Sequence, residues 1–188
     1  MNKTPHLLLA SKSPRRQQIL HDAGFDFDFV EIDAPEDFSS HLLPSKICEL
    51  LAIQKSEHYL LPIKTSILVT ADTIVYVNGK VLNKPNDRNE AFAMLTELSG
   101  ITHKVYTGVC LRNDTKKHVF HDCTAVTFYP LTADQICYYI DTFDPYDKAG
   151  SYGVQDWMGY VGVKNIDGCF YNVMGFPMAK FYRELSAF

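Results

Sequence analysis

A basic segment, Ser11-Lys12-Ser13-Pro14-Arg15-Arg16, lies between a short apolar run and the start of a predicted helix. The positive end of a helix dipole disfavours cations in the first turn, so Arg15 and Arg16 are costly there unless an anion lies among them. Backbone N–H groups, the hydroxyls of Ser11 and Ser13 and the guanidinium groups could together bind a phosphate. The alternative for this segment, taken alone, is a solvent-exposed basic loop.

Asp72 is a second candidate, because it stands between two apolar runs at residues 67–71 and 74–77. We expect a carboxylate in that position to be partly buried. Such a group must be paired, hydrogen-bonded, metal-bound or protonated. In isolation, a structural aspartate that accepts hydrogen bonds from backbone amides explains the position as well as a catalytic one does.

Three lysines stand beside apolar sequence. Lys55 follows Leu51 along one face of a predicted helix, and Lys84 follows a predicted hairpin. Lys148 lies in the segment Asp147-Lys148-Ala149-Gly150. Taken singly, each is more often a surface lysine whose aliphatic stem covers apolar neighbours.

Other polar and aromatic residues are weaker candidates. His118 and His121 are an odd number of positions apart, so in a strand they point to opposite faces and make a poor metal-binding pair. Trp157 could stack on a nucleobase, but packing in the core is the simpler explanation.

The elements that position these residues follow from apolar runs and turn signals. Leu7–Ala10 predicts a buried strand, followed by a helix from Pro14 that Ser13 would cap and Gly24 would end. A second helix is expected after Pro44.

Two hairpins are predicted farther along the chain. Asn78-Gly79 lies between strand-like residues 74–77 and Lys80–Leu82, which is a strong signal for a two-residue turn. Residues 105–112 and 119–129 flank a second turn at Asn113-Asp114.

Capping patterns predict further helices. Asp87 with Glu90, and Thr132 with Gln135, each resemble a capping box at the start of an apolar-periodic run. These helices would reach Gly100 and about residue 140, and a last helix would follow residue 177.

The composition bounds the fold. At 188 residues the chain suits one well-buried core and is too short for two ordinary domains, so residues 1–188 are predicted to form a single domain. Alternating strands and helices predict an α/β protein, and the hairpins exclude a purely parallel sheet. The expected fold is a mixed α/β sheet with flanking helices.

Charge and cysteine content bound the function. The net charge of −4 gives no general attraction to nucleic acid. The 5 cysteines are odd in number and include no Cys-x-x-Cys, which favours free thiols in a reducing compartment over disulfides or a zinc ribbon. No apolar run is long enough for a signal peptide or a membrane span. We therefore expect a cytoplasmic protein with no membrane partner.

Several segments together resemble the Maf family of nucleotide pyrophosphatases, which is related in fold to the inosine-triphosphate pyrophosphatases. They occur in order over nearly the whole chain, so the match is more specific than any single segment. The segments are Leu9-Ala10-Ser11-Lys12-Ser13-Pro14-Arg15-Arg16, Ala71-Asp72-Thr73-Ile74-Val75, Asn83-Lys84-Pro85, Leu98-Ser99-Gly100-Ile101-Thr102-His103, Asp147-Lys148-Ala149-Gly150-Ser151-Tyr152-Gly153-Val154-Gln155 and Asn172-Val173-Met174-Gly175-Phe176-Pro177.

The resemblance implies a twisted mixed sheet in two lobes around a central cleft that holds the active site. It also implies a homodimer, a divalent metal (Mg²⁺ or Mn²⁺) and a nucleoside triphosphate substrate, cut between the α- and β-phosphates. Asp72 matches the family's catalytic base, and Glu36 its second acidic position; both are expected at the metal, and whether Asp72 is base or metal ligand stays open. The matching substrate- and phosphate-binding positions are Ser11, Ser13, Arg15, Arg16, Lys55, Lys84 and Lys148.

Three positions resemble the family branch that acts on dTTP and UTP: Arg15, Thr73 and Gln155. The branch that acts on 7-methyl-GTP has glutamine at the position of Thr73 and glutamate at that of Gln155. The difference has a physical reason, because a carboxylate suits the N–H donors of guanine and an amide suits the mixed edge of thymine and uracil.

Departures from the family pattern leave every chemical group in place: Ser56, Asn83, Asp156 and Phe176 replace the usual residues. Asp156, beside Trp157, bears on the shape of the base pocket.

The sequence leaves two alternative functions open. One is a pyrophosphatase for 7-methyl-GTP or another modified purine nucleotide, and the other is a non-catalytic nucleotide-binding regulator of cell division. The presence of Asp72 favours an enzyme.

Overall fold

The computed structural model describes residues 5–188, and they divide into two compact units. The first unit contains the described residues up to Asp72, together with Thr107–Asp122 and Gly175–Phe188. The second contains Thr73–Tyr106 and Cys123–Met174. Each unit is therefore built from segments that are distant in the sequence. The single domain over residues 1–188 stays a prediction.

The described residues contain a seven-stranded sheet, whose strands in chain order are β1 (Leu7–Ala10), β2 (Phe27–Phe29), β3 (Ile67–Val77), β4 (Lys80–Leu82), β5 (Thr102–Arg112), β6 (Lys117–Phe128) and β7 (Val163–Asp167). Their hydrogen-bonded order is β2-β1-β3-β5-β6-β7, with β4 paired to β3. β1 pairs in parallel with β2 and β3, whereas β4 and β7 pair antiparallel with β3 and β6. This topology confirms the predicted mixed α/β sheet.

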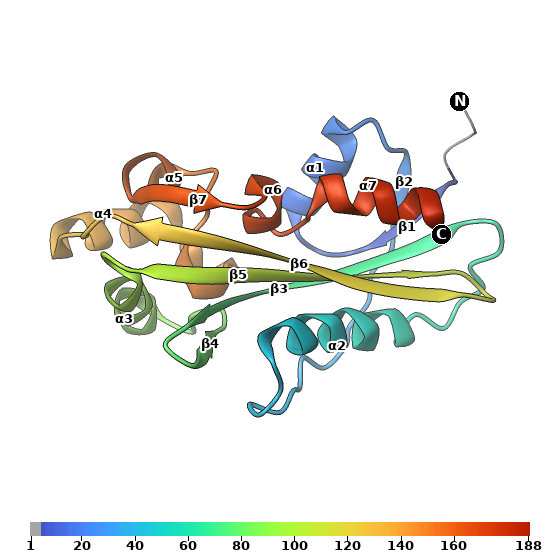
Figure 1. The fold of residues 1–188 in the computed structure, drawn as a ribbon, viewed down its shortest axis with the longest axis horizontal. Helices are drawn as coiled ribbons and strands as arrows, with labels where there is room; N and C mark the ends of the chain where they lie inside the picture. The colour runs from blue at the N-terminus through green and yellow to red at the C-terminus, as the bar shows by residue number, and fades with distance from the viewer. Residues whose placement is uncertain (1–4) are drawn as a thin grey trace. The chain divides into compact units, whose positions relative to one another are not determined.

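The helices accompany these strands in alternation. They are α1 (Pro14–Asp22), α2 (Pro44–Glu57), α3 (Arg88–Leu98), α4 (Ala133–Phe143), α5 (Trp157–Val161), α6 (Phe170–Val173) and α7 (Met178–Ala187), with short 3₁₀ helices at Pro145–Asp147 and Ala149–Ser151. Figure 1 shows the first unit's α1 and α7 with β1 and β2.

In the first unit, β1 lies between β2 and the first half of β3. Leu7 and Leu9 are fully buried on one face of β1, and on the other face Ala10 is buried and Leu8 partly buried, as expected for a central parallel strand. The following helix begins at Pro14, whose missing N–H is no loss at the first helical position. Ser13 occupies the N-cap position of α1, but its side chain accepts no hydrogen bond from the helix. The predicted helix is confirmed. The prediction that the Ser13 side chain caps it is wrong, although Ser13 does occupy the N-cap position.

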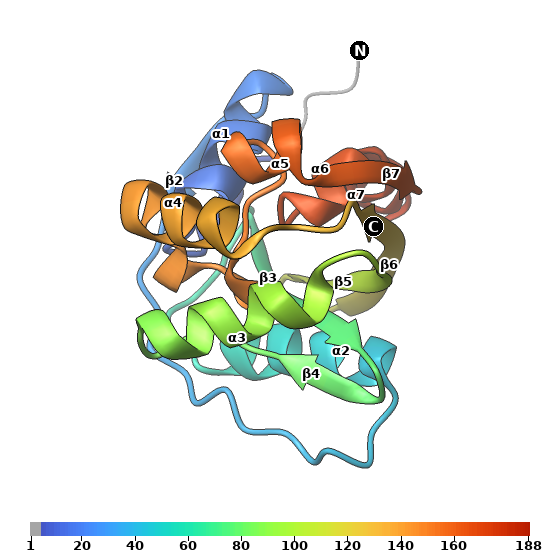
Figure 2. The same ribbon diagram turned by 90° about the vertical axis from the view of Figure 1, so that its left-hand side faces the viewer.

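In the second unit, β3 turns through Asn78 and Gly79 into β4. The φ angles of these two residues are 50° and 83°, as a type I′ turn requires, so the predicted hairpin is confirmed. Farther along the chain, α3 and α4 pack against each other (Figure 2).

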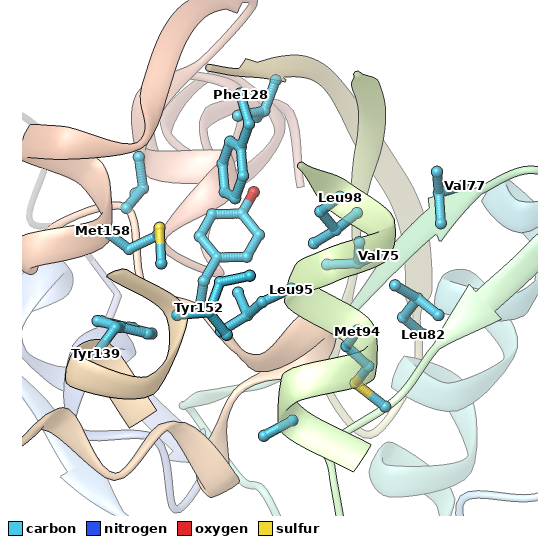
Figure 3. Close-up of a cluster of buried hydrophobic side chains, with 14 of the residues drawn as sticks. Val75, Val77, Leu82, Met94, Leu95, Leu98, Phe128, Tyr139, Tyr152 and Met158 are labelled. Atoms are coloured by element: carbon cyan, nitrogen blue, oxygen red, sulfur yellow. The ribbon is translucent and has the colours of Figure 1, made fainter. Parts of the chain in front are cut away.

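The buried core of the second unit gathers around Tyr152. Its ring lies between Leu95 and Phe128 (Figure 3), with the Phe128 and Tyr152 ring centroids 4.9 Å apart. The Tyr152 hydroxyl is 2.7 Å from His103 Nε2, and both side chains are buried. A polar pair therefore stands inside an otherwise apolar core.

The two predicted capping boxes differ in detail. At α4, Thr132 accepts a hydrogen bond from the Gln135 N–H, and the Gln135 side chain accepts one from the Thr132 N–H, so the box is complete. At α3, Asp87 accepts from the Glu90 N–H. The Glu90 carboxylate instead accepts from the Asn86 backbone, one residue earlier than the pattern predicts. Both helices are confirmed.

The state and burial of the cysteines agree with part of what the sequence predicts. The cysteines are free, and burial raises the pKa of the Cys48 thiol to about 12. Cys110 is also buried, whereas Cys123 is exposed, so only some of the thiols are buried as predicted. Within residues 5–188, the structure has no helix with the length and apolar character that crossing a membrane requires.

Candidate functional site

Asp72 lies in the middle of β3 and is only 8% exposed. Its Oδ1 forms an ion pair with Lys55 Nζ, and the same ammonium group lies 2.7 Å from Glu36 Oε1. One cation is thus shared by two carboxylates. The predicted burial of Asp72 is confirmed, and the two predicted acidic positions converge on one lysine.

The position of Lys55 follows from the packing of α2. The helix buries Cys48 and Leu51, which precede Lys55 by seven and four residues and share its face. At Gly108 of β5, an added Cβ would overlap the Cys48 carbonyl, so helix and strand backbones are in close contact. This contact directs the lysine toward the sheet. A cation in the last turn also suits the negative end of the helix dipole.

Arg16 joins three segments of the first unit. Its Nε donates to Gly175 O at 2.8 Å, and its Nη1 donates to Ala71 O at 2.9 Å and to Ser11 Oγ at 3.0 Å. Burial lowers the pKa of Arg16, and the charge of Asp72 acts in the opposite direction. Arg16 is therefore partly a structural residue, which the sequence did not indicate.

The start of α1 brings the serines together with this arginine. Ser11 is buried, and its Oγ accepts hydrogen bonds from the Ser13 N–H at 3.3 Å and from Arg16. Ser13 and Arg15 are partly exposed at the first turn. Lys12 is instead an exposed partner of Glu31. Within the basic segment, Ser11 and Arg16 therefore contact each other inside the first unit, whereas Lys12 faces solvent.

In the second unit, Lys148 is held at the loop that leads to Gly150. Its Nζ lies 2.7 Å from Asp147 Oδ1, and its side chain is only 12% exposed. Gly150 has a φ of 68°, and an added Cβ would lie 2.9 Å from Val75 Cγ2. Only glycine fits such a position without strain.

The same loop is tied to the segment that carries Lys84. The Gly150 N–H donates to Asn83 O at 3.1 Å, next to Lys84. Lys84 itself is exposed. The structure therefore brings the backbones of two predicted phosphate-binding segments together within one unit.

The two predicted specificity positions of the second unit are both partly buried. Thr73 follows Asp72 in β3, and Gln155 lies at the end of the Asp147-to-Gln155 segment. The Gln155 Oε1 atom is buried, and no donor among residues 5–188 reaches it. A buried acceptor without a partner costs free energy, which a ligand N–H could recover.

The placement of these groups around a cleft between two lobes stays a prediction. The first unit contains Ser11, Ser13, Arg15, Arg16, Glu36, Lys55 and Asp72. The second unit contains Thr73, Lys84, Lys148 and Gln155.

The carboxylates around Lys55 supply part of what a divalent metal needs. No cluster of three or more His, Cys, Asp or Glu side chains that could hold a metal occurs among the described residues. Glu36 and Asp72 supply two carboxylates, and Mg²⁺ is commonly held by one or two carboxylates with substrate phosphates. These residues therefore fit a metal that arrives with a nucleotide.

The histidines do not contribute to such a site. His118 pairs with Glu184 at 2.7 Å, and His121 pairs with Glu49 at 2.6 Å. The two histidines thus contact different helices, α7 and α2, as expected for side chains on opposite faces of a strand.

One group near Gln155 was missed by the sequence reading. The Tyr139 hydroxyl donates to Asp156 Oδ2 at 2.9 Å and accepts from the Gly153 N–H at 3.0 Å. Asp156 was noted only as a departure from the family pattern, and nothing in the sequence linked it to Tyr139, because the pairing depends on tertiary packing.

Comparison with known proteins gives one family. The family model for Maf-like protein matches residues 6–188. The protein named dTTP/UTP pyrophosphatase from Porphyromonas gingivalis is 43% identical over 188 residues, covering 97% of this chain and 94% of that one. The protein of the same name from Carboxydothermus hydrogenoformans is 45% identical over 181 residues, covering 95% and 96%.

Among solved structures, the Staphylococcus aureus Ham1 protein matches with a TM-score of 0.48 at 15% identity, covering 65% of this chain and 71% of that chain. That score is too low to support a conclusion. The full-length family match and the relatives above show that this chain belongs to the Maf family.

Proposed function

We propose that this protein hydrolyses dTTP and UTP to the monophosphate and pyrophosphate, with a divalent cation, Mg²⁺ or Mn²⁺, as cofactor. The observation that carries the proposal is the buried Asp72 carboxylate, which shares the ammonium group of Lys55 with Glu36. Membership of the Maf family and relatives named dTTP/UTP pyrophosphatase support the reaction and the substrate.

In the proposed mechanism, Asp72 orients a water molecule toward the α-phosphorus and takes its proton. Lys55 stands at the same carboxylate and holds it in place. When bound, the metal would neutralise phosphate charge, with Glu36 and Asp72 as its protein ligands. Asp72 thus serves as base, as ligand, or as both in turn.

Cations stabilise the departing pyrophosphate in this proposal. Phosphoryl transfer depends mainly on positioning and on electrostatic stabilisation of charge at the phosphates. Arg15, Lys84 and Lys148 are the cationic side chains proposed for this role. Arg16 donates to the carbonyl of Ala71, the residue before Asp72, and also to Ser11 Oγ. Arg16 and Ser11 therefore contribute mainly by fixing the position of the base.

Gln155 is proposed to recognise the pyrimidine. Uracil and thymine present a carbonyl, an N–H and a carbonyl along one edge. The buried Gln155 Oε1 supports this role, because it is an acceptor that lacks a donor within the described part of the chain. It would accept from the ring N–H, and the Gln155 amide would donate to a neighbouring carbonyl. Thr73 and Arg15 complete the proposed specificity set.

A nucleotide panel tests the proposal. Purified protein is incubated with Mg²⁺ or Mn²⁺ and dTTP, UTP, CTP, GTP or 7-methyl-GTP, and pyrophosphate and orthophosphate are measured separately. We expect pyrophosphate from dTTP and UTP at the highest kcat/KM. A preference for 7-methyl-GTP would contradict the proposed substrates. If no nucleotide gave any product, the alternative of a nucleotide-binding regulator would be favoured.

The remaining parts of the proposal were expected from the sequence, and of these only the homodimer comes from the family resemblance. They are a cytoplasmic location, a homodimer and a single functional domain over residues 1–188. Light scattering coupled to size-exclusion chromatography would test the dimer, and a monomer at micromolar concentration would contradict it.

A further inference from the structure

Tyr139 places a hydroxyl group in the middle of the turn that carries Gln155. The side chain is fully buried on α4, and its ring stacks on Trp157, with the planes 21° apart and the centroids at 6.2 Å. Burial, together with the charge of Asp156, raises the pKa of Tyr139. The hydroxyl therefore keeps its proton, donates it to Asp156 and accepts from the Gly153 N–H.

Asp156 closes the turn from the other side. Its Oδ2 accepts from Tyr139, while its Oδ1 accepts from the Met158 N–H and so caps α5. The Asp156 N–H donates to Gly153 O at 3.4 Å. Asp156 therefore ties residues 153–156 both to α4 and to the start of α5.

Gln155 lies inside this closed turn. An added Cβ at Gly153 would lie 2.8 Å from Gln155 Nε2, so the amide folds back over Gly153. This places the Nε2 end of the amide against the turn, while the Oε1 end is buried with no donor among residues 5–188. The direction of the amide thus depends on the conformation of residues 153–156.

We propose that Tyr139 and Asp156 are positioning residues for nucleobase selection, because they fix the turn that orients the Gln155 amide. This inference rests on the proposed function and deepens it. Neither residue is required to touch the nucleotide.

The orientation of the amide has a chemical consequence. A fixed Oε1 can accept from the ring N–H of uracil, but at the same ring position cytosine has an acceptor. An amide that could rotate would serve either base, by offering Oε1 to one and Nε2 to the other. The ratio of UTP to CTP efficiency therefore reports how firmly the amide is held.

The test compares Tyr139→Phe and Asp156→Ala with wild type. Each variant removes the hydrogen bond between the two side chains and leaves the proposed catalytic side chains Asp72, Lys55 and Glu36 unchanged. We expect the UTP-to-CTP ratio of kcat/KM to fall roughly ten-fold or more, which corresponds to an unpaired buried polar group of about 1–3 kcal/mol. The loss on UTP should appear in KM, with kcat changed by less than about three-fold.

Matched controls separate positioning from general damage. Tyr138→Phe removes a hydroxyl from the neighbouring residue of the same helix, where the side chain is half exposed, and should change neither ratio nor KM. Asp156→Asn keeps a side chain of the same size, whose carbonyl oxygen can still cap α5 and whose NH₂ group can donate to the Tyr139 hydroxyl oxygen, so it should restore most of the selectivity that Asp156→Ala loses. Gln155→Ala defines the ratio expected when the amide is absent.

The outcomes are distinguishable. If wild type releases no pyrophosphate from UTP, the proposed function fails. If wild type is active and Gln155→Ala lowers the ratio, but Tyr139→Phe and Asp156→Ala keep the wild-type ratio, the positioning inference alone is overturned. A loss of kcat at unchanged selectivity would also overturn it. Should Tyr139→Phe fail to fold, the comparison of Asp156→Ala with Asp156→Asn decides.

Discussion

The ammonium group of Lys55 is shared by Asp72 and Glu36, and this arrangement defines the chemistry of the first unit. Asp72 is nearly buried, whereas the Glu36 side chain is about half exposed. A buried carboxylate that loses its ion-pair partner is destabilising, but an exposed carboxylate that loses the same partner costs little. The three side chains therefore contribute differently to stability and to chemistry, and their substitution should have different consequences.

Asp72→Asn should abolish most turnover without unfolding the protein. The change is nearly isosteric, and it removes the charge that accepts a proton or holds a metal. Removing a general base typically costs roughly 10²- to 10⁴-fold in rate. Steady-state kinetics on UTP measure this, with thermal unfolding as the control for folding. Turnover within a few-fold of wild type would mean that Asp72 is not the base.

Lys55→Met should lower the melting temperature and make it more sensitive to divalent cations. The variant leaves two carboxylates without their shared ammonium, so Mn²⁺ should raise the melting temperature more than it does in wild type. Thermal unfolding with and without Mn²⁺ measures this without any substrate. Lys46→Met is the matched control, because Lys46 pairs with Glu49 on the same helix and is mostly exposed. An equal Mn²⁺ response in wild type and Lys55→Met would argue against Glu36 and Asp72 as metal ligands.

Gln155→Glu should shift base preference away from pyrimidines. A carboxylate opposite the carbonyl oxygens of uracil leaves acceptors facing each other, at about 1–3 kcal/mol for an unpaired buried group. The ratio of kcat/KM for dTTP to that for GTP should fall roughly ten- to a hundred-fold. Adding Thr73→Gln should shift it further. An unchanged ratio in both variants would remove these positions from base selection.

At the scale of elements, sequence reading succeeded where structure is decided locally. The Asn78-Gly79 hairpin and the Thr132–Gln135 capping box depend on residues a few positions apart, and both are confirmed. For the stretch between Gly150 and Gly175, the sequence predicted no helix or strand. The stretch contains α5, β7 and α6, which are four or five residues long and carry too little periodicity to be recognised.

The loop at Gly150 is constrained both by its backbone angle and by the side chain of Val75. Gly150→Ala places a Cβ both at positive φ and against Val75, so it should displace the segment that carries Lys148. Gly24→Ala is the matched control, with a similar φ of 77° and open space around the added Cβ. The control should cost about 1–2 kcal/mol of unfolding free energy. Gly150→Ala should cost more, by about 1–3 kcal/mol for the overlap, and should also raise KM for UTP.

Chemical denaturation and steady-state kinetics measure the two effects. If the two variants lose the same unfolding free energy, the close approach of Val75 is not a constraint on the loop.

At the scale of the whole molecule, both units are assembled from distant parts of the chain. The candidate residues could be selected from the sequence through their types and through family resemblance. Their partners could not, because Lys55 meets Glu36, and Arg16 meets Gly175, only after the chain has folded. The buried His103–Tyr152 pair was likewise absent from the sequence reading, since burial of a polar residue has no local signature.

His103 should make the folded protein sensitive to acid. Burial lowers the pKa of His103 to about 4, whereas an unfolded histidine binds its proton near 6.5. Between these values the unfolded state binds more protons, so this contribution is fully present above about pH 6.5 and is lost as pH falls toward 4. The loss is on the order of 3 kcal/mol. His103→Gln should have a flatter profile of unfolding free energy in this window.

Urea denaturation from pH 7 to pH 4 measures this profile. His21→Gln, which changes an exposed histidine, should keep the wild-type slope. Parallel profiles for wild type and His103→Gln would show that His103 is not the group responsible.

The position of bond cleavage can be read directly from the products of UTP hydrolysis in H₂¹⁸O with Mg²⁺. Attack of water on the α-phosphorus transfers one ¹⁸O atom to the monophosphate and leaves the pyrophosphate unlabelled. Mass spectrometry of UMP and pyrophosphate from a single turnover, with Asp72→Asn as the blank, distinguishes the alternatives. We predict label in UMP alone. Label in pyrophosphate, or labelled orthophosphate with UDP, would contradict hydrolysis at the α-phosphorus.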